Sequence, residues 1–385
     1  MNNFSLYNPV KIHFGEGQIK QLSTEIPKDA KVLISYGGGS IKANAVYQQV
    51  IDALQGHAYI EFSGIEPNPE YETCMKAVAL IKKEKIDFVL AVGGGSIIDA
   101  TKFIVAAVDY EGKDPWDILA KGAEVTSAIP YGTVLTLPAT GSEMNAGSVI
   151  SRREFGDKLA FDSPHVFPKF SILDPVTTYT LPIRQVTNGI VDAFVHVMEQ
   201  YLTYPANAPI QDRFAEGILL TLIEEGPKAL ENPKDYDARA NIMWCATMAL
   251  NGLINQGVPQ DWATHMIGHE LTAMYGLDHA QTLAIVLPNI INYKRDKKEA
   301  KLLQYAERVW NITKGNTNER IDAAIEKTRA FFEAMGAKTK LSGYDVDTSK
   351  LPDIVSALER HNMVALGEHK DIAISDSKKI LEMCI

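Results

Sequence analysis

The sequence predicts an α/β domain over residues 1–182, followed by an all-helical domain over residues 183–385. In the first part, short β-branched runs alternate with helical stretches, which is typical of a parallel sheet covered by helices. After Pro175 and Pro182, strand-like runs almost disappear and helical periodicity takes over. A chain of 385 residues is long enough for two domains with full cores.

The expected elements of the first domain follow from the spacing of apolar residues. Strands are predicted at 31–36, 57–62, 87–92, 132–140 and 170–175. The apolar runs there are nearly continuous, as expected for strands that are buried on both faces. Helices are predicted at 47–55 and 71–86, where apolar residues recur at helical intervals.

The same helical spacing runs through the second domain. It predicts helices at 184–203, 210–230, 238–254 and 319–336. The charged stretch KRDKKEAK, residues 294–301, is expected to be a solvated helix face. No internal repeat or low-complexity tract is present.

Composition excludes several classes of protein. The net charge is −10 and no long run of Lys or Arg occurs, which argues against nucleic acid as a partner. No basic segment followed by an apolar one opens the chain, and no apolar run approaches the roughly 20 residues of a membrane span. Three cysteines far apart in the chain indicate free thiols in a reducing compartment. We therefore expect a cytoplasmic protein without a membrane or nucleic-acid partner.

The tetrapeptide Gly-Gly-Gly-Ser follows a predicted strand twice, at 37–40 and at 93–96. At the second turn, Ser96 is well placed as a helix N-cap and Asp99 lies near the positive end of the helix. The G-x-G-x-x-G fingerprint is absent. However, exposed amides at a glycine-rich helix start also form an anion site, and the glycines would let a diphosphate approach. The motif alone leaves both interpretations open.

The first glycine turn lacks an acidic residue. No Asp or Glu occurs between Ser35 and Lys42. A carboxylate there would bind the ribose hydroxyls of NAD and repel the extra phosphate of NADP. Its absence, with the Ser40 hydroxyl and Lys42 nearby, favours NADP weakly.

Histidines gather in two clusters. Asp192 and His196 lie four residues apart, and so do His265 and His269, with His279 further on. Residues four apart on a helix share one face and can hold one cation. An Asp–His hydrogen bond alone would also satisfy the first pair, but buried charges on two apolar helices favour a metal, such as zinc, iron or manganese. Spacing does not choose between His265 and His269.

Seven segments together resemble the iron-containing, or group III, alcohol dehydrogenases, and most closely the NADPH-dependent aldehyde reductase and butanol dehydrogenase branch. They are VKIHFGEG, GIEPNP, AVGGGSIIDATKF, LTLPATGSEMN, LDPVTTYTLP, VDAFVHVMEQY and GHELTAMYGLDHAQTLAIVLP. The resemblance covers nearly the whole chain. It implies a Rossmann-like nucleotide-binding domain at 1–182 and a metal-binding, catalytic domain at 183–385, as in dehydroquinate synthase-like proteins.

The resemblance also implies site residues. The metal, iron or zinc, is assigned to Asp192, His196, His265 and His279, while His269 resembles a non-ligand histidine near the nicotinamide and is expected to be catalytic. Asp99 is expected among both the catalytic and the cofactor-binding residues. The NADP(H) residues implied are Gly37, Gly38, Gly39, Ser40, Asn68, Gly94, Gly95, Ser96, Thr136, Thr140, Ser142, Lys158, Tyr179 and Leu181.

The implied reaction is hydride transfer between NADPH and a short-to-medium chain aldehyde, or the reverse oxidation of a primary alcohol. A homodimer or larger homo-oligomer is expected. Two alternatives remain at this point. One is another enzyme on the same scaffold, resembling glycerol dehydrogenase or dehydroquinate synthase. The other is a nucleotide and metal sensor without turnover. The largely apolar segment VDAFVHVMEQY, residues 191–201, favours small unbranched aldehydes over a charged substrate.

Overall fold

A six-stranded parallel sheet forms the centre of the first part of the chain. The structure, a computed structural model, describes residues 1–385. The strand order is β1-β8-β5-β4-β2-β3, and every neighbouring pair is parallel. The strands are β1 Lys11–Phe14, β2 Lys31–Ser35, β3 Ala58–Phe62, β4 Phe88–Gly94, β5 Tyr131–Leu137 and β8 Phe170–Leu173. All five predicted strands are present, whereas β1 is an edge strand that the sequence did not predict.

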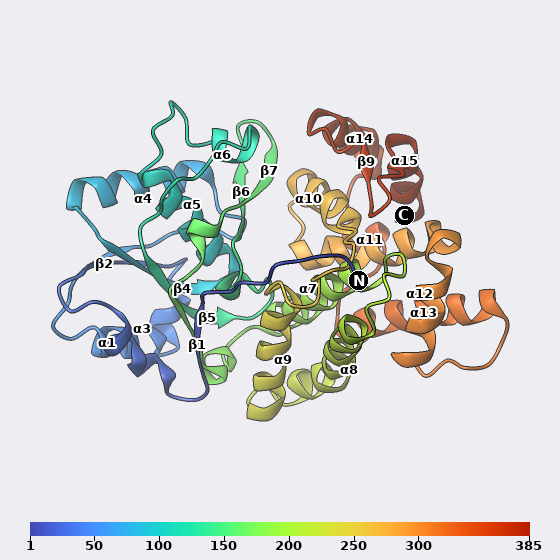
Figure 1. The fold of residues 1–385 in the computed structure, drawn as a ribbon, viewed down its shortest axis with the longest axis horizontal. Coiled ribbons are helices and arrows are strands. Elements are labelled where there is room, and N and C mark those ends of the chain that lie inside the picture. The colour runs from blue at the N-terminus through green and yellow to red at the C-terminus, as the bar shows by residue number, and fades with distance from the viewer. The chain divides into compact units, whose positions relative to one another are not determined.

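Helices cover both faces of this sheet (Figure 1). Alternate strand residues such as Leu33 and Val89 pack with the long helices α4 and α5, whereas Val32 and Leu90 pack with α1 and α3 on the other face. This two-sided burial explains the continuous apolar runs. The helices are α1 Leu22–Glu25, α2 Ser40–Ala43, α3 Val46–Ala53, α4 Tyr71–Glu84, α5 Gly95–Val108 and α6 Asp117–Ala120.

An antiparallel hairpin lies outside the main sheet. It consists of β6 Gly147–Arg152 and β7 Asp157–Asp162, and its first strand contacts α5. The sequence did not predict it, because its strands carry many polar residues. Short 3-10 helices occur at Gln18–Gln21, Ser142–Met144, Pro164–Val166 and Pro175–Thr178.

The rest of the chain is almost entirely helical, as predicted. Its helices are α7 Ile183–Tyr201, α8 Pro209–Glu231, α9 Tyr236–Ala249, α10 Ala263–Tyr275, α11 His279–Tyr293, α12 Arg295–Arg308, α13 Thr317–Ala334, α14 Leu351–Arg360 and α15 Ile374–Met383, with 3-10 turns at Leu341–Tyr344 and Thr348–Lys350. Two-residue strands, β9 Ala365–Leu366 and β10 Ile372–Ala373, form a small hairpin before α15. None of the helices is long and apolar enough to cross a lipid bilayer.

By compactness, the chain divides into a sheet unit and a helical unit. The sheet unit consists of Tyr7–Leu181 and Pro233–Met243, and the helical unit of Met1–Leu6, Pro182–Asn232 and Trp244–Ile385. The predicted α/β domain followed by a helical domain is therefore the correct fold class. The units are less contiguous than the predicted ranges, since residues 1–6 and 233–243 cross over.

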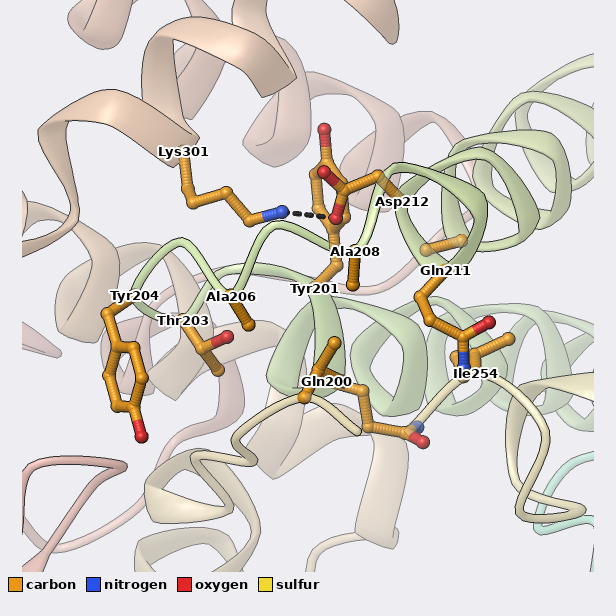
Figure 2. Close-up of a pocket in the computed structure, with 12 residues that line it drawn as sticks. Gln200, Tyr201, Thr203, Tyr204, Ala206, Ala208, Gln211, Asp212, Ile254 and Lys301 are labelled. Carbon is orange, nitrogen blue, oxygen red and sulfur yellow. Dashed lines mark hydrogen bonds and ion pairs between the residues drawn. The ribbon is translucent and has the colours of Figure 1, made fainter. Parts of the chain in front are cut away.

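The predicted solvated face at 294–301 is only partly correct, because Asp296, Lys297, Glu299 and Ala300 are exposed but the other face of the helix is buried. Lys294, Lys298 and Lys301 are buried, and Lys298 is only 2% exposed. Each ammonium group pairs with carboxylates from distant parts of the helical unit, as Figure 2 shows for Lys301 and Asp212. Such pairing allows a lysine to be buried. A run of charges in sequence does not reveal these partners.

Candidate active site

Three helices of the helical unit bring an aspartate and three histidines together. Helix α7 carries Asp192 and His196, α10 carries His265, and α11 begins at His279. The Oδ1 atom of Asp192 lies 3.6 Å from Nε2 of His196, 3.8 Å from Nε2 of His265 and 3.7 Å from Nε2 of His279. Ligand atoms of Asp192, His265 and His279 all lie within 4.8 Å of one another. His196 is outside that group, and its place beside it rests on the 3.6 Å distance from its Nε2 to Oδ1 of Asp192.

The geometry of this cluster fits a divalent cation. All three distances exceed hydrogen-bonding range. In a tetrahedral site with bonds near 2.1 Å, neighbouring ligand atoms are about 3.4 Å apart. Nε2 of His265 is buried and has no hydrogen-bond partner. One carboxylate with three imidazoles is a donor set that suits iron or zinc.

Burial keeps His196 in the form that binds metals. Its ring stacks on that of His265, with centroids 4.6 Å apart. Burial lowers the pKa of His196 to about 4, so the imidazole is neutral near pH 7. A neutral imidazole is the ligand that zinc and iron require.

A residue that the sequence analysis missed, Glu199, orients His265. Its carboxylate accepts a hydrogen bond from Nδ1 of His265 and one of 2.6 Å from the backbone N–H of Thr264. This hydrogen bond directs Nε2 of the ring toward Asp192. Burial lowers the pKa of His265, but the charges of Glu199 and Asp192 outweigh burial and raise the pKa to about 9. A metal that binds Nε2 near pH 7 therefore displaces a proton from this ring. Glu199 lies seven residues after Asp192 and therefore near the same face of α7. This spacing alone was too weak to identify it as a site residue without the fold.

His269 lies beside the cluster and not within it. Its buried ring has its centroid 5.1 Å from that of His279 and 6.2 Å from that of His265. Like His196, it is outside the group of ligand atoms within 4.8 Å, but Nε2 of His196 lies 3.6 Å from Oδ1 of Asp192. The sequence left the choice between His265 and His269 open, and it is Nε2 of His265 that faces Asp192.

The second glycine turn differs from the predicted capping. Helix α5 begins at Gly95 with Gly94 as its N-cap, so the prediction of Ser96 as the cap is wrong. A Cβ atom on Gly95 would lie 2.5 Å from Oγ1 of Thr140, and one on Gly94 would lie 2.9 Å from Cβ of Leu137. Close packing within the sheet unit thus accounts for both glycines, with or without a diphosphate.

Asp99 is engaged within the protein. One of its oxygens accepts a 2.5 Å hydrogen bond from the Ser142 hydroxyl, and the other accepts a 2.9 Å bond from the Val149 N–H. The fully buried Lys102 also donates to Ser142, at 2.8 Å, and burial lowers the pKa of this lysine to about 8. These contacts fix the Ser142 turn and the first strand of the β6–β7 hairpin. The catalytic and cofactor-binding roles of Asp99 stay predictions.

Other residues that are expected to bind the cofactor form hydrogen bonds with one another. Nζ of Lys158 donates to Oδ1 of Asn68 over 2.8 Å, although the two are far apart in sequence. Oγ1 of Thr140 accepts a hydrogen bond from the Ser142 N–H at 3.2 Å. Thr136 is at the end of β5, while Tyr179 and Leu181 follow the 3-10 helix after β8. Both of these strands end at the carboxyl edge of the sheet, where doubly wound folds bind nucleotides.

The first glycine turn is open. A Cβ atom on Gly38 or Gly39 would meet nothing within 4 Å, and Gly39 has a φ of +98°. In contrast, a Cβ on Gly37 would approach the Ile65 carbonyl at 3.2 Å. Helix α2 begins at Ser40. The turn therefore has room for a ligand against Gly38 and Gly39.

A carboxylate lies beside this turn after all. Glu61, near the end of the neighbouring strand β3, accepts hydrogen bonds of 2.6 Å from the hydroxyls of Tyr36 and Tyr47 and pairs with Lys42 at 2.9 Å. Burial opposes its ionisation, but these three donors prevail and lower the pKa of Glu61 to about 2. This acid is on the adjacent strand β3, outside the residues of the turn, and was not predicted.

Comparison with known proteins identifies the family. Residues 9–175 match the family described as iron-containing alcohol dehydrogenase, and residues 186–382 match the C-terminal part of the same family. The NADPH-dependent aldehyde reductase YqhD of Escherichia coli is 65% identical over 99% of both chains. A probable NADH-dependent butanol dehydrogenase of Bacillus subtilis is 43% identical over 99% of both chains.

Solved structures agree with this result. The crystal structure of the E. coli protein YqhD has a TM-score of 0.99 at 64% identity, covering 100% of this chain and 99% of that one. NADH-dependent butanol dehydrogenase A of Thermotoga maritima has a TM-score of 0.95 at 37% identity, again over 100% and 99% of the two chains. The protein therefore belongs to the iron-containing alcohol dehydrogenase family.

Proposed function

We propose that the protein is an NADPH-dependent aldehyde reductase that also oxidises primary alcohols. The observation that carries this proposal is the convergence of three imidazole Nε2 atoms on one carboxylate oxygen of Asp192. Family membership and the 65% identity to an NADPH-dependent aldehyde reductase support it. Short-to-medium chain aldehydes are the proposed substrates.

Asp192, His196, His265 and His279 hold one divalent metal, iron or zinc, in this proposal. When bound, the metal supplies a Lewis acid that polarises a carbonyl oxygen. The chain contributes a neutral His196, an oriented His265 and the charge of Asp192. His269, buried beside the ligands, passes a proton to the oxygen of the alcohol product in this proposal.

The sheet unit binds the nucleotide, which supplies the hydride. The open turn at Gly37, Gly38, Gly39 and Ser40 takes the adenosine end, and the amides at Gly94, Gly95 and Ser96 take the diphosphate. Asn68 and Lys158, already in contact, line the remainder of the site with Thr136, Thr140, Ser142, Tyr179 and Leu181. Functionally, residues 1–182 are the nucleotide-binding domain and residues 183–385 the metal-binding domain.

NADH is the second candidate cofactor, because a specific observation favours it. Glu61 lies beside the first glycine turn, where a carboxylate would bind ribose hydroxyls. However, Glu61 already accepts hydrogen bonds from Lys42 and two tyrosine hydroxyls, and the lysine charge offsets its own, which reduces its capacity to bind or repel a cofactor. NADPH remains the proposed cofactor. The proposal also includes a cytoplasmic homodimer or larger homo-oligomer.

The test measures turnover and metal in the same samples. Purified protein is assayed with butanal and either NADPH or NADH, by loss of absorbance of the reduced nicotinamide. It is then stripped with a strong chelator and reloaded with Fe²⁺ or Zn²⁺. We expect activity with NADPH that disappears on stripping and returns with metal. Full activity in metal-free protein would contradict the metal site, and binding without turnover would favour a sensor.

A further inference from the structure

Lys298 joins three segments of the helical unit at one buried point. Its ammonium group donates to the Leu202 carbonyl at 2.6 Å, to Oδ2 of Asp261 at 2.8 Å and to Oε1 of Glu368 at 2.7 Å. All three donors of the ammonium group are thereby used. The side chains of Lys298, Asp261 and Glu368 are only 2%, 6% and 2% exposed. Leu202 ends α7, which carries Asp192 and His196.

Asp261 connects Lys298 to the start of α10. Its backbone N–H donates to the Glu199 carbonyl over 2.9 Å, and its Oδ1 accepts from the Ala263 N–H at 3.0 Å. The other carboxylate oxygen is the one that Lys298 holds. Both oxygens of Asp261 are therefore committed, one to α12 and one to the first residue of α10.

The residue between Asp261 and Ala263 has an unusual backbone conformation. Trp262 is the N-cap of α10 and has a φ of +64°, the left-handed region that a bulky residue rarely adopts. Its ring meets those of His196 and His265 edge-on, with centroids 6.2 Å and 5.4 Å away. The turn before α10 thus holds a tryptophan against two of the proposed ligands. Such a conformation persists only where surrounding contacts fix it.

We propose that Lys298 is a positioning residue for the metal site, acting through Asp261 on the turn at Trp262 and on His265. The inference rests on the metal site proposed above. Lys298 links the end of the helix that bears Asp192 and His196 to the beginning of the helix that bears His265. Glu199 connects the same two helices closer to the metal site, through Thr264 and His265. The two links together set the separation of the ligands.

Removal of the lysine charge would leave two buried carboxylates side by side. Asp261 and Glu368 would repel each other without a counter-ion, which is strongly unfavourable at this degree of burial. Asp261 would then move or take a proton, and the cap on Ala263 and the position of Trp262 would change with it. The expected consequence is a weaker, misaligned metal site. Changes of partners that orient metal ligands typically cost 10- to 100-fold in metal affinity.

Lys301 provides a matched control on the same helix. It is buried, pairs with Asp212 and lies over the Tyr201 ring at 4.4 Å (Figure 2). Asp212 is on α8, which carries none of the proposed ligands, and Tyr201 is the last residue of α7, so the contacts of Lys301 do not include α10. Lys298→Met and Lys301→Met therefore each remove one buried lysine from one ion-pair network, and only the first network reaches α10.

The experiment measures the dissociation constant for Zn²⁺ by competition with a chromophoric chelator, in wild type and both variants. We expect about 10- to 100-fold weaker binding in Lys298→Met and a change below about 3-fold in Lys301→Met. The visible absorption bands of bound Co²⁺, which report the arrangement of the ligands, should change only in Lys298→Met. Urea unfolding of the metal-free proteins shows whether the two variants are comparably destabilised.

The outcomes separate this inference from the proposed function. If wild type binds no metal, or His196→Ala binds it as tightly as wild type, the proposed metal site fails. If wild type binds metal and Lys298→Met binds it equally well, or Lys301→Met weakens binding as much, the positioning role fails. If Lys298→Met does not fold, the same measurements are made on Asp261→Asn, with Asp212→Asn as its control. An asparagine offers one oxygen where Asp261 uses two.

Discussion

The carboxylate of Glu199 accepts hydrogen bonds from both Nδ1 of His265 and the backbone N–H of Thr264. One side chain of α7 thereby fixes the ring orientation of a ligand on α10 and also caps the first turn of that helix. With Nδ1 donating, Nε2 is the nitrogen that faces Asp192. A carboxylate that orients a metal-bound histidine in this way also increases its basicity.

Glu199→Gln should weaken metal binding by about 10- to 100-fold. A glutamine oxygen can accept from only one of the two donors, so its amide group would face the other donor. Metal content and the Zn²⁺ dissociation constant measure the effect. The control is Glu224→Gln on α8, which replaces a glutamate on a helix that carries no proposed ligand. Equal metal affinity in Glu199→Gln and wild type would mean that His265 does not depend on this hydrogen bond.

His196→Ala and His269→Ala should separate metal binding from proton transfer. We expect His196→Ala to lose the metal and nearly all activity, because Nε2 of this residue faces Asp192 at 3.6 Å. His269→Ala should keep the metal and lose about 100-fold in kcat, as is typical for a general acid. Elemental analysis and steady-state kinetics on the same preparations distinguish loss of the metal from loss of proton transfer. A stoichiometric metal in His196→Ala, or its loss in His269→Ala, would reverse the assignment.

Features that depend on residues close together in the chain were predictable from the sequence. The strands of the parallel sheet are continuous apolar runs because both of their faces are buried, and Asp192 and His196 share a face because they are four apart on α7. Glu199 and Lys298 were not found, because the partners of Glu199 lie 65 and 66 residues away, those of Lys298 lie 37 or more residues away, and only the fold brings them together. Lys298 even appeared to belong to a solvated face.

The two glycine turns also show that a sequence does not reveal the surroundings of a residue. Two identical Gly-Gly-Gly-Ser sequences have different environments: Gly94 and Gly95 pack against Leu137 and Thr140, whereas Gly38 and Gly39 are open. Sequence predicts that each turn needs glycine, but it does not show what the glycine accommodates. Similarly, the acid beside the first turn comes from the adjacent strand and is invisible within the turn itself.

Glu61 should contribute stability that disappears in acid. The pKa of this carboxyl group is about 2 in the folded chain against a usual value of 4.5. The contribution is therefore complete above about pH 4.5 and is lost as the pH falls toward 2. Because the side chain is 30% exposed, solvent screening reduces this contribution to about 1–2 kcal/mol at pH 7.

Urea unfolding of wild type and Glu61→Gln from pH 7 down to the acid limit of folding tests this contribution. Wild type should be more stable at pH 7, and the difference in free energy of unfolding should shrink steadily below about pH 4.5. Glu72→Gln on α4 is the control, because that side chain is 52% exposed and its ion pair with Nε of Arg152, at 3.7 Å, contributes little. A difference that does not depend on pH would show that the tyrosine and lysine partners do not stabilise the ionised form.

Gly38→Asp should shift cofactor preference from NADPH toward NADH. Gly38 is the suitable position because its added Cβ meets nothing within 4 Å and its φ is unexceptional, whereas the φ of +98° at Gly39 would strain any side chain. At roughly 4 Å and an effective dielectric near 20, two like charges repel by about 4 kcal/mol. Screening by solvent reduces this to about 1–3 kcal/mol, or about 5- to 150-fold in kcat/KM for NADPH.

The same aspartate can accept hydrogen bonds from the ribose hydroxyls of NADH, so kcat/KM for NADH should be unchanged or increased. Gly38→Asn is the matched control, since it has the shape of aspartate without the charge. It should lower both values of kcat/KM to a similar extent and leave their ratio nearly constant. The measurement is kcat/KM for both cofactors with butanal in the three proteins. If wild type prefers NADH, or if Gly38→Asp and Gly38→Asn change the ratio equally, the 2′-phosphate does not lie against this turn.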